Sequence, residues 1–224
     1  AKHAQLWRDA GISAINVSID SLDPANFQRI TGMDHLPQVL KGLEAAENAG
    51  FEDIKINTVL LKDLNHHELD NFLAFVKNRR ISLRFIELME TGDNRAYFEK
   101  HHLCASHISD ALKNRGWQPI PRSIAAGPAQ EFSHPDYAGT IGIIAPYAKD
   151  FCQTCNRLRV TARGDLRLCL FGDGGHNLRH MLQSADQKTE LQHTVTSLLQ
   201  QKASTHLLHF HKSGATKNLS ALGG

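Results

Sequence analysis

The strongest constraint on the fold is an alternation of strand-like and helix-like segments between residues 14 and 89. Apolar and polar side chains alternate at residues 14–20, 53–60 and 81–89, a pattern typical of strands with two different faces. Between these strands, residues 36–49 and 67–78 carry apolar side chains at helical spacing. Strands separated by helices, at a repeat of roughly thirty residues, indicate βαβ units. The alternation therefore predicts a parallel sheet in an α/β fold.

One face of these strands is unusually polar for a parallel sheet, because such sheets are normally covered by helices on both faces. If helices cover the apolar face, the polar face must line a cavity. The interior of a closed (βα)8 barrel is packed with branched side chains, so we expect an open, ligand-holding barrel or curved sheet instead. About three βα units are present, too few to close a barrel. The polar face carries Asn16, Ser18, Asp20, Lys55, Asn57 and Arg84.

The rest of the chain has a different character, and we predict two parts with a boundary at residue 92. Residues 1–92 are expected to be the second half of a partial barrel, and residues 93–224 a small α+β domain. The further elements that we expect are helices at 5–10, from Asp23 to Thr31, from Ser106 to Arg115, at 177–183 and at 188–208, a polar loop at 91–102, an irregular crossover with one strand at 117–135, and an apolar strand at 139–145.

Composition excludes several classes of protein. The 224 residues suffice for one sizeable domain or two small ones. A net charge of +2 argues against a general binder of nucleic acids or acidic membranes. The apolar runs are too short to span a bilayer, and the first residues do not resemble a signal peptide. Four unevenly spaced cysteines do not suggest a secreted disulfide framework, so we expect a cytoplasmic protein.

Three of the four cysteines lie in residues 151–170 in a C-x2-C-x13-C pattern, whereas Cys104 stands alone and is interpreted as incidental. Alternation on both sides of Gly164 and Asp165 predicts a β-hairpin. Pairing about this turn places odd-numbered residues on one face, and the leucines and Val160 on the packed face. The odd-numbered face carries Arg157, Arg159, Arg167 and Cys169, so we expect a metal centre beside an anion site.

The cysteine pattern allows three interpretations. Cys152, Cys155 and Cys169 could form a zinc site with His176 or His180 as the fourth ligand. They could also bind an iron–sulfur cluster, although such clusters usually take four thiolates. The third interpretation is three idle thiols. From the residues alone, zinc is slightly favoured because a histidine follows closely.

The basic residues near these cysteines and in the cavity suggest binding of an anion. Arg157 and Arg159 would present two guanidinium groups about 7 Å apart, which suits phosphates or carboxylates. The plain alternative is an ordinary solvated strand face. Lys55 and Arg84 on inward polar faces are costly unless an anion or a carboxylate pairs with them.

Several of these motifs together resemble one family, the radical S-adenosylmethionine GTP 3′,8-cyclases of molybdenum cofactor biosynthesis. The C-x2-C-N-R-x-R pattern that begins at Cys152 and continues to Cys169 is similar to the second iron–sulfur motif of that family. The resemblance extends from near residue 10 to the last residue, so it covers essentially the whole chain. Further matching segments lie at residues 16–22, 31–32, 55–57, 83–89 and 223–224.

The resemblance implies an iron–sulfur cluster in place of zinc. A [4Fe-4S] cluster would be bound by Cys152, Cys155 and Cys169, with one iron left open for the guanine of GTP. The family fold is an incomplete (βα)6 barrel with a small α+β domain. The residues that would contact GTP are Lys55, Arg84, Arg157, Leu158 through its backbone, and Arg159.

The resemblance also implies a lyase reaction that uses S-adenosylmethionine. Ser18 and Met89 would contact S-adenosylmethionine, and Gly223 and Gly224 would reach the active site and assist catalysis. In the family, a radical derived from S-adenosylmethionine abstracts hydrogen from the ribose C3′ of GTP, which then attacks C8 to give 3′,8-cyclo-7,8-dihydro-GTP.

One family motif is not among these residues: the C-x3-C-x2-C motif of the amino-terminal cluster that cleaves S-adenosylmethionine. We therefore expect a carboxyl-terminal portion that supplies the GTP-binding half and is inactive alone. It would form a homodimer or associate with a missing amino-terminal half. The alternatives are a zinc-stabilised nucleotide-binding module without catalysis and an interaction fragment.

Overall fold

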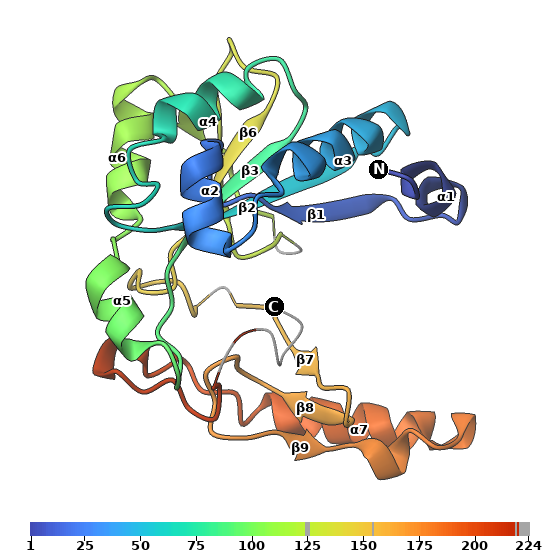
Figure 1. The fold of residues 1–224 in the computed structure, drawn as a ribbon. Coiled ribbons are helices and arrows are strands. Elements are labelled where there is room, and N and C mark those ends of the chain that lie inside the picture. Colours follow the sequence, from blue (N-terminus) through green and yellow to red (C-terminus); the bar gives the residue numbers. More distant parts are fainter. Residues whose placement is uncertain (124–125, 154, 218, 220–224) are drawn as a thin grey trace. The chain divides into compact units, whose positions relative to one another are not determined.

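The computed structural model describes residues 1–123, 126–153, 155–217 and 219, which form two compact units (Figure 1). The sheet unit comprises Ala1–Leu88 and Lys100–Ala145, and the hairpin unit comprises Met89–Glu99 and Pro146–Gly224. The functional division at residue 92 that the sequence suggests stays a prediction. Among the described residues, no helix combines the length and the apolar character needed to cross a bilayer.

The sheet unit contains a six-stranded, mainly parallel sheet in the order β1-β2-β3-β6-β5-β4. The first four strands in this order pair in parallel, and the last two continue the sheet antiparallel. The predicted α/β class with a parallel sheet is confirmed at this level. The strands are β1 (Ala14–Ser18), β2 (Asp53–Leu60), β3 (Ser82–Glu87), β4 (Gln118–Pro119), β5 (Gln130–Ser133) and β6 (Thr140–Ile144).

Helices cover one face of this sheet, and their starts and stops follow local chemistry. The Asp23 side chain accepts a hydrogen bond of 2.8 Å from the Asn26 backbone N–H, and Pro24 occupies the first turn. The same helix ends at Gly32, where φ is 74°. The helices are α1 (Ala4–Asp9), α2 (Pro24–Thr31), α3 (Leu36–Asn48), α4 (Leu69–Val76) and α6 (Ser106–Asn114), with α5 (Arg95–His101) at the boundary between the units.

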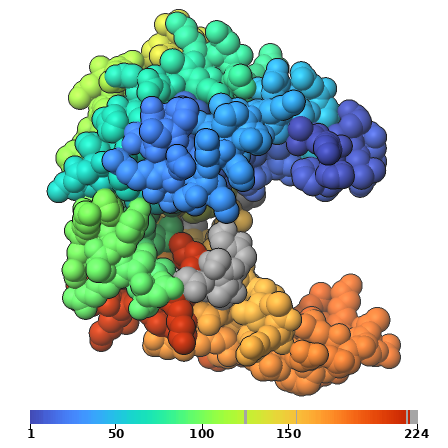
Figure 2. All heavy atoms as spheres, in the orientation of Figure 1, coloured from blue at the N-terminus to red at the C-terminus, as the bar shows by residue number. Residues whose placement is uncertain are grey.

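The core of the sheet unit lies between this helical layer and the apolar face of the sheet. Burial alternates along β2 and β3, so Ile56 and Phe85 are almost fully buried while their neighbours are not. Phe72 of α4 contacts Phe85 edge-on, with ring centroids 5.5 Å apart. Each such buried side chain contributes about 1.5–3 kcal/mol. At the edge strand β1, helices α1 and α3 pack together, and both are blue in the space-filling view (Figure 2).

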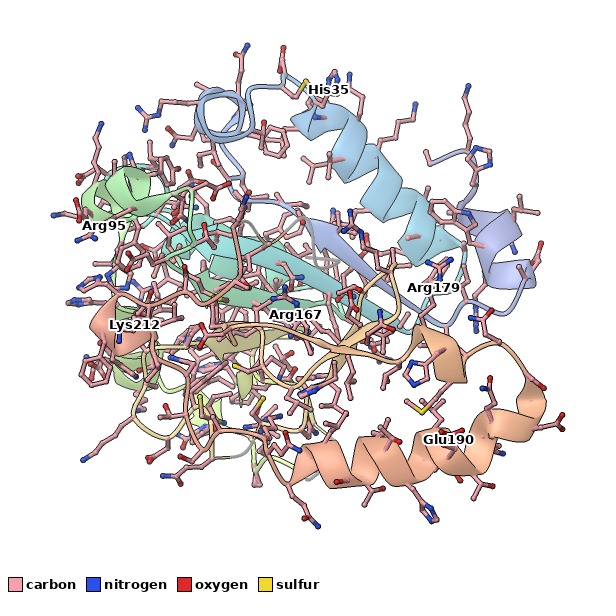
Figure 3. All side chains as sticks on the ribbon, turned by 90° about the horizontal axis from the view of Figure 1, so that it is seen from below. His35, Arg95, Arg167, Arg179, Glu190 and Lys212 are labelled. Atoms are coloured by element: carbon pink, nitrogen blue, oxygen red, sulfur yellow. The ribbon has the colours of Figure 1, made fainter. Side chains whose placement is uncertain are left out.

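The hairpin unit contains a three-stranded antiparallel sheet and one longer helix, α7 (Lys188–Leu199). Its strands are β7 (Arg159–Val160), β8 (Asp165–Arg167) and β9 (His176–Asn177), and its 3-10 turns are Arg179–Met181, Ala185–Gln187 and Leu208–Phe210. A small core joins the sheet to α7, which runs beside the strand that carries Arg167 (Figure 3). This core consists of Leu166, Leu178 and Met181, against which Leu168, Leu191, Val195 and Leu198 pack.

The predicted hairpin is confirmed, with odd-numbered residues of the two arms opposite each other. Arg159 lies opposite Arg167, and Gly164 takes a φ of 83° in the turn. The prediction that Leu158 and Val160 lie on the packed face is wrong, since these side chains are 37% and 59% exposed. Strand β7 has only 2 residues. The side chain that packs the hairpin into the small core is Leu166 of β8.

Five other local predictions are wrong. Residues 91–102 contain helix α5, in which Phe98 is buried. Ser106 is the first helical residue and makes no capping bond, because Ala105 is the N-cap. Residues 177–183 form strand β9 and a 3-10 turn, and residues 117–135 contain two strands. Helix α7 ends at Leu199, where its apolar stripe also ends.

Candidate functional site

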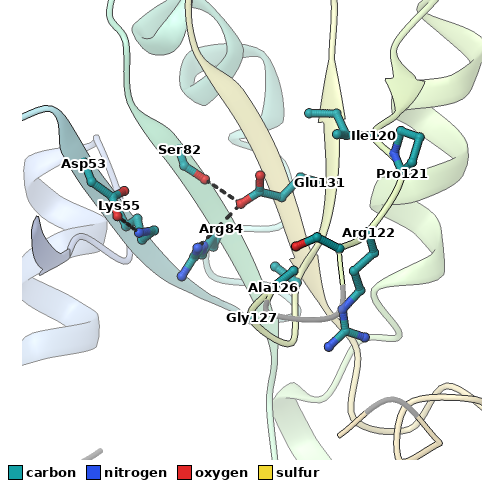
Figure 4. Close-up of a pocket in the computed structure, with 12 residues that line it drawn as sticks. Asp53, Lys55, Ser82, Arg84, Ile120, Pro121, Arg122, Ala126, Gly127 and Glu131 are labelled. Atoms are coloured by element: carbon teal, nitrogen blue, oxygen red, sulfur yellow. Dashed lines mark hydrogen bonds and ion pairs between the residues drawn. The ribbon is translucent and has the colours of Figure 1, made fainter. Parts of the chain in front are cut away.

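The polar face of the sheet unit lines a pocket of about 450 Å³, as the sequence predicts for this face (Figure 4). Its charged lining consists of Asp53, Lys55, Arg84, Arg122 and Glu131. The parallel register places Lys55 beside Ser82 and Asn57 beside Arg84 on neighbouring strands. The structure therefore brings Lys55 and Arg84, two of the expected GTP contacts, to one cavity.

Two of the cations in this pocket are paired with carboxylates. Lys55 forms an ion pair with Asp53, two residues earlier on the same strand. Arg84 Nη2 lies 3.5 Å from Glu131 Oε1, to which the Ser82 hydroxyl also donates at 3.3 Å. The Arg84 side chain is only 15% exposed, and its buried Nε has no hydrogen-bond partner among the described residues. An anionic ligand entering here would find a desolvated guanidinium with donors still available.

Ser18 and Met89 lie in different units, so each is described separately. Ser18 is the exposed last residue of β1 and lies beside Asn57, whose buried Oδ1 has no partner among the described residues. Asp20 follows, and its carboxylate accepts from the Val59 backbone N–H at 2.8 Å. Burial raises the pKa of Asp20, and this hydrogen bond partly opposes the effect. Met89 follows β3, and its carbonyl accepts from the Asn94 side chain at 2.9 Å.

A buried amide fixes the strand ends next to Ser18. The Asn65 side chain donates to the carbonyls of Asp20 at 2.6 Å and Val59 at 2.7 Å, and accepts from the Leu61 N–H at 2.8 Å. Asn65 is 2% exposed, so these bonds are shielded from water. The carboxyl ends of β1 and β2 are therefore held at a defined separation.

The three hairpin cysteines are half-buried free thiols that influence one another electrostatically. Burial is the main cause that raises the pKa of Cys169, and negative charge on Cys152 and Cys155 raises it further. The backbone N–H of Phe171 and the ammonium of Lys202 act in the opposite direction. No described group of three or more His, Cys, Asp or Glu side chains is arranged to hold a metal ion.

The donor chemistry of the cysteine site fits an iron–sulfur cluster. The chain turns tightly between two of the thiols, with the Cys155 N–H donating to the Cys152 carbonyl at 3.1 Å. The ammonium group of Lys202 lies 3.6 Å from Cys155 Sγ. The histidines considered as a fourth zinc ligand, His176 and His180, are both exposed.

Arg157, Leu158 and Arg159 lead from the cysteine turn into β7. Arg157 is exposed, Leu158 is 37% exposed, and Arg159 is half-buried opposite Arg167. The described residues supply no ion pair to Arg157 or Arg159, whereas Arg167 donates to the Thr216 hydroxyl at 3.5 Å. Both guanidinium groups are thus free to bind an anion beside the cysteines. Gly223 and Gly224 lie outside the described residues.

Four residues of these sites were not predicted from the sequence, namely Asp53, Arg122, Glu131 and Lys202. In β5 the half-buried Glu131 is followed by the buried Phe132, which is the alternation of a strand. The strand has only 4 residues, so the pattern in the sequence is too short to indicate a site. Lys202 has no local pattern that connects it with the cysteines. Its role becomes visible only in the tertiary structure, where its ammonium group donates to the carbonyls of Cys155 and Arg157.

Comparison with known proteins identifies the family of the chain. Residues 1–76 match the family model of the radical SAM superfamily, and residues 81–208 match that described as Molybdenum Cofactor Synthesis C. A relative from Klebsiella pneumoniae (strain 342), named GTP 3′,8-cyclase, is 53% identical over 224 residues. The match covers 100% of this chain and 68% of the relative. The chain therefore belongs to the family of GTP 3′,8-cyclases.

Proposed function

We propose that this chain binds GTP for its S-adenosylmethionine-dependent conversion into 3′,8-cyclo-7,8-dihydro-GTP, a step of molybdenum cofactor biosynthesis. Family membership supports the reaction class. The observation that carries the proposal is the pair Arg157 and Arg159, which have no carboxylate partner among the described residues and follow the cysteine turn directly. Two adjacent guanidinium groups suit a triphosphate, because each can form two parallel hydrogen bonds with phosphate oxygens.

The proposed ligands of a [4Fe-4S] cluster are Cys152, Cys155 and Cys169. With three thiolates bound, such a cluster supplies an iron atom with an open position for the guanine base. The residue types and the short turn between Cys152 and Cys155, where the Cys155 N–H donates to the Cys152 carbonyl at 3.1 Å, support this assignment. Cys152 and Cys155 precede β7, whereas Cys169 follows β8. Because β7 and β8 pair as a hairpin around Gly164, the chain returns toward the first two cysteines before it reaches Cys169.

In the sheet unit, Lys55 and Arg84 are proposed to contact GTP, and Ser18 to contact S-adenosylmethionine. The buried, unpartnered Nε of Arg84 supports its role, because a bound anion would satisfy that donor. In the hairpin unit, the Leu158 backbone is proposed to contact GTP and Met89 to contact S-adenosylmethionine. The proposed catalytic role of Gly223 and Gly224 concerns residues beyond the described part of the chain.

We also propose that the parallel sheet is part of an incomplete (βα)6 barrel. The polar lining of its pocket supports this, because a lumen that holds ligands requires polar side chains on that face. The edge position of β1 in the described sheet is compatible with further strands pairing there.

The test of the proposed function is the double variant Arg157→Ala/Arg159→Ala. GTP binding would be measured by calorimetry under anaerobic conditions, on the full chain reconstituted with iron and sulfide. A hydrogen bond to a charged group contributes about 1.5–3 kcal/mol, so we expect affinity to fall by roughly 100-fold or more.

Arg163→Ala is the matched control, because Arg163 is exposed in the turn of the same hairpin. This variant should bind GTP like the parent chain. Equal affinity in the double variant, or an equal loss in the control, would contradict the proposal. Metal analysis of the reconstituted chain should find iron and acid-labile sulfide, and a single tightly bound zinc would instead support the non-catalytic zinc module.

A further inference from the structure

A lysine outside every predicted site contacts the cysteine turn directly. Lys202 Nζ donates to the carbonyl oxygens of Cys155 at 3.0 Å and Arg157 at 2.9 Å. The same nitrogen lies 3.6 Å from Cys155 Sγ. An ammonium group has three N–H donors, and these three acceptors can use all of them. The half-buried side chain therefore contacts both a proposed cluster ligand and a proposed GTP ligand.

The main chain at Lys202 is itself held in place by the hairpin core. Leu191, Val195 and Leu198 of α7 pack against Leu166 and its neighbours on the hairpin side. After α7 the chain continues in tight turns, and the Lys202 N–H donates to the Leu199 carbonyl at 3.1 Å. The lysine thus reaches the cysteine turn from a fixed base, so its contact can restrain the turn.

The chemistry of the contact suits a cation. The carbonyl oxygens of Cys155 and Arg157 converge on one point, where their partial negative charges would repel each other without a shared donor. Among the described residues, Lys202 forms no ion pair with a carboxylate, so its charge acts on the carbonyls and the thiol. Groups that orient metal ligands and donate toward ligating sulfur affect both metal affinity and cluster properties.

We propose that Lys202 is a positioning residue for the substrate-binding cluster and for the guanidinium pair. It holds the backbone from Cys155 to Arg157, so that the thiol and the two arginines keep a fixed relation. Its charge also complements an iron-bound thiolate at Cys155. This inference rests on the proposed function, and it adds a residue that acts through its neighbours rather than by touching GTP.

The experiment compares Lys202→Met, Lys202→Arg and the control Lys188→Met in the full chain. Methionine keeps the length of the side chain and removes its charge and donors, whereas arginine retains both. Lys188 is an exposed lysine at the start of α7, the helix that precedes Lys202. Without metal, hydrogen exchange of amides 155–160 should be about tenfold faster in Lys202→Met, because local opening becomes easier. Amides of the sheet unit serve as the internal control for folding.

The second readout is GTP binding to each chain after reconstitution with iron and sulfide. We expect Lys202→Met to lose roughly tenfold or more in GTP affinity, the size expected for misplaced charged hydrogen bonds. The change that GTP causes in the EPR spectrum of the reduced cluster should also diminish. Lys202→Arg should recover GTP affinity to within about threefold of the parent chain, and Lys188→Met should match the parent.

The outcomes separate this inference from the proposed function. If Lys202→Met matches the parent chain in both exchange and GTP affinity, the inference is overturned. Faster exchange without a loss of GTP affinity would make the contact merely structural and would also overturn it. An arginine variant as weak as the methionine variant would exclude a role for charge and donors. If the parent chain itself binds no GTP, the proposed function fails, and the exchange comparison still tests whether Lys202 holds the turn.

Discussion

At the scale of single residues, the pocket of the sheet unit is defined by cations that already have anionic partners. The sequence indicates that Lys55 and Arg84 are costly on an inward face unless an anion or a carboxylate pairs with them. The structure supplies such carboxylates in Asp53 and Glu131. A triphosphate that approaches Nη2 of Arg84 would therefore compete with Glu131 for that donor.

This competition predicts that Glu131→Gln strengthens GTP binding. Partly exposed ion pairs are worth about 0.2–1 kcal/mol, so we expect affinity to rise by up to about fivefold. Guanosine, which has no phosphate, should show no such gain. Calorimetry would compare the variant with Glu99→Gln, which removes an exposed carboxylate from a helical ion pair in the hairpin unit. Weaker GTP binding in Glu131→Gln would show that the carboxylate assists the ligand.

At the scale of elements, the loop from β2 to α4 determines where the neighbouring strand β1 ends. Asn65 binds three backbone groups there, and the buried carboxylate of Glu68 accepts from Ser21, Leu22 and Asn26. These bonds connect the loop after β1 to the start of α4. The proposed cofactor contact Ser18 thus depends on a polar network rather than on its own strand alone.

Replacing Asn65 with Ala should destabilise the sheet unit. Each buried backbone group left without a partner costs about 1–3 kcal/mol, so we expect a loss of at least roughly 2 kcal/mol. Urea unfolding followed by circular dichroism measures this loss. Asn78→Ala, at an exposed position after α4, is the control and should change stability by less than about 0.5 kcal/mol. A similar small change for Asn65→Ala would contradict the role of the network.

At the scale of the whole chain, the hairpin unit joins segments that are far apart in the sequence. The Gly92 N–H donates to the Thr216 carbonyl at 3.0 Å, and the Ala215 N–H donates to Gly172 at the same distance. His206, 5% exposed, lies 2.8 Å through Nε2 from the Pro146 carbonyl, while its Nδ1 accepts from the Leu208 N–H at 3.2 Å. A neutral ring with its proton on Nε2 satisfies both contacts.

This arrangement predicts that the hairpin unit becomes less stable in mild acid. Burial is the main cause that lowers the pKa of His206 below its ordinary value, and the bond to Pro146 partly opposes it. The folded chain thus prefers the neutral ring, and the associated stability is full above the unfolded pKa of about 6.5. That stability declines as the pH falls through and below this value, because the unfolded chain binds the proton first.

The measurement is denaturant unfolding at pH 8 and pH 5.5, comparing the parent chain with His206→Gln. We expect the parent to lose more stability over this range than the variant, which has no titrating ring at this position. An equal loss in both chains would assign the acid sensitivity to other groups.

Much of the fold is predictable from the sequence, because the determining interactions are local. Alternation at residues 53–60, the cap at Asp23 and the turn at Gly164 each specify an element through side chains only a few residues apart. The cysteine and arginine spacing was likewise sufficient to predict the candidate site and the family. Helix α5 escaped prediction because its single buried apolar side chain, Phe98, does not establish a helical period.

The sequence alone determined the parallel strands with one polar face, the hairpin that follows the cysteine turn, and the residue types available to bind an anion. Only the tertiary structure decided that Glu131 meets Arg84 and that Lys202 meets Cys155 and Arg157. In each of these contacts, the two residues are more than forty positions apart in the sequence. Their meeting depends on how whole strands and helices pack, and a local pattern carries no information on that packing.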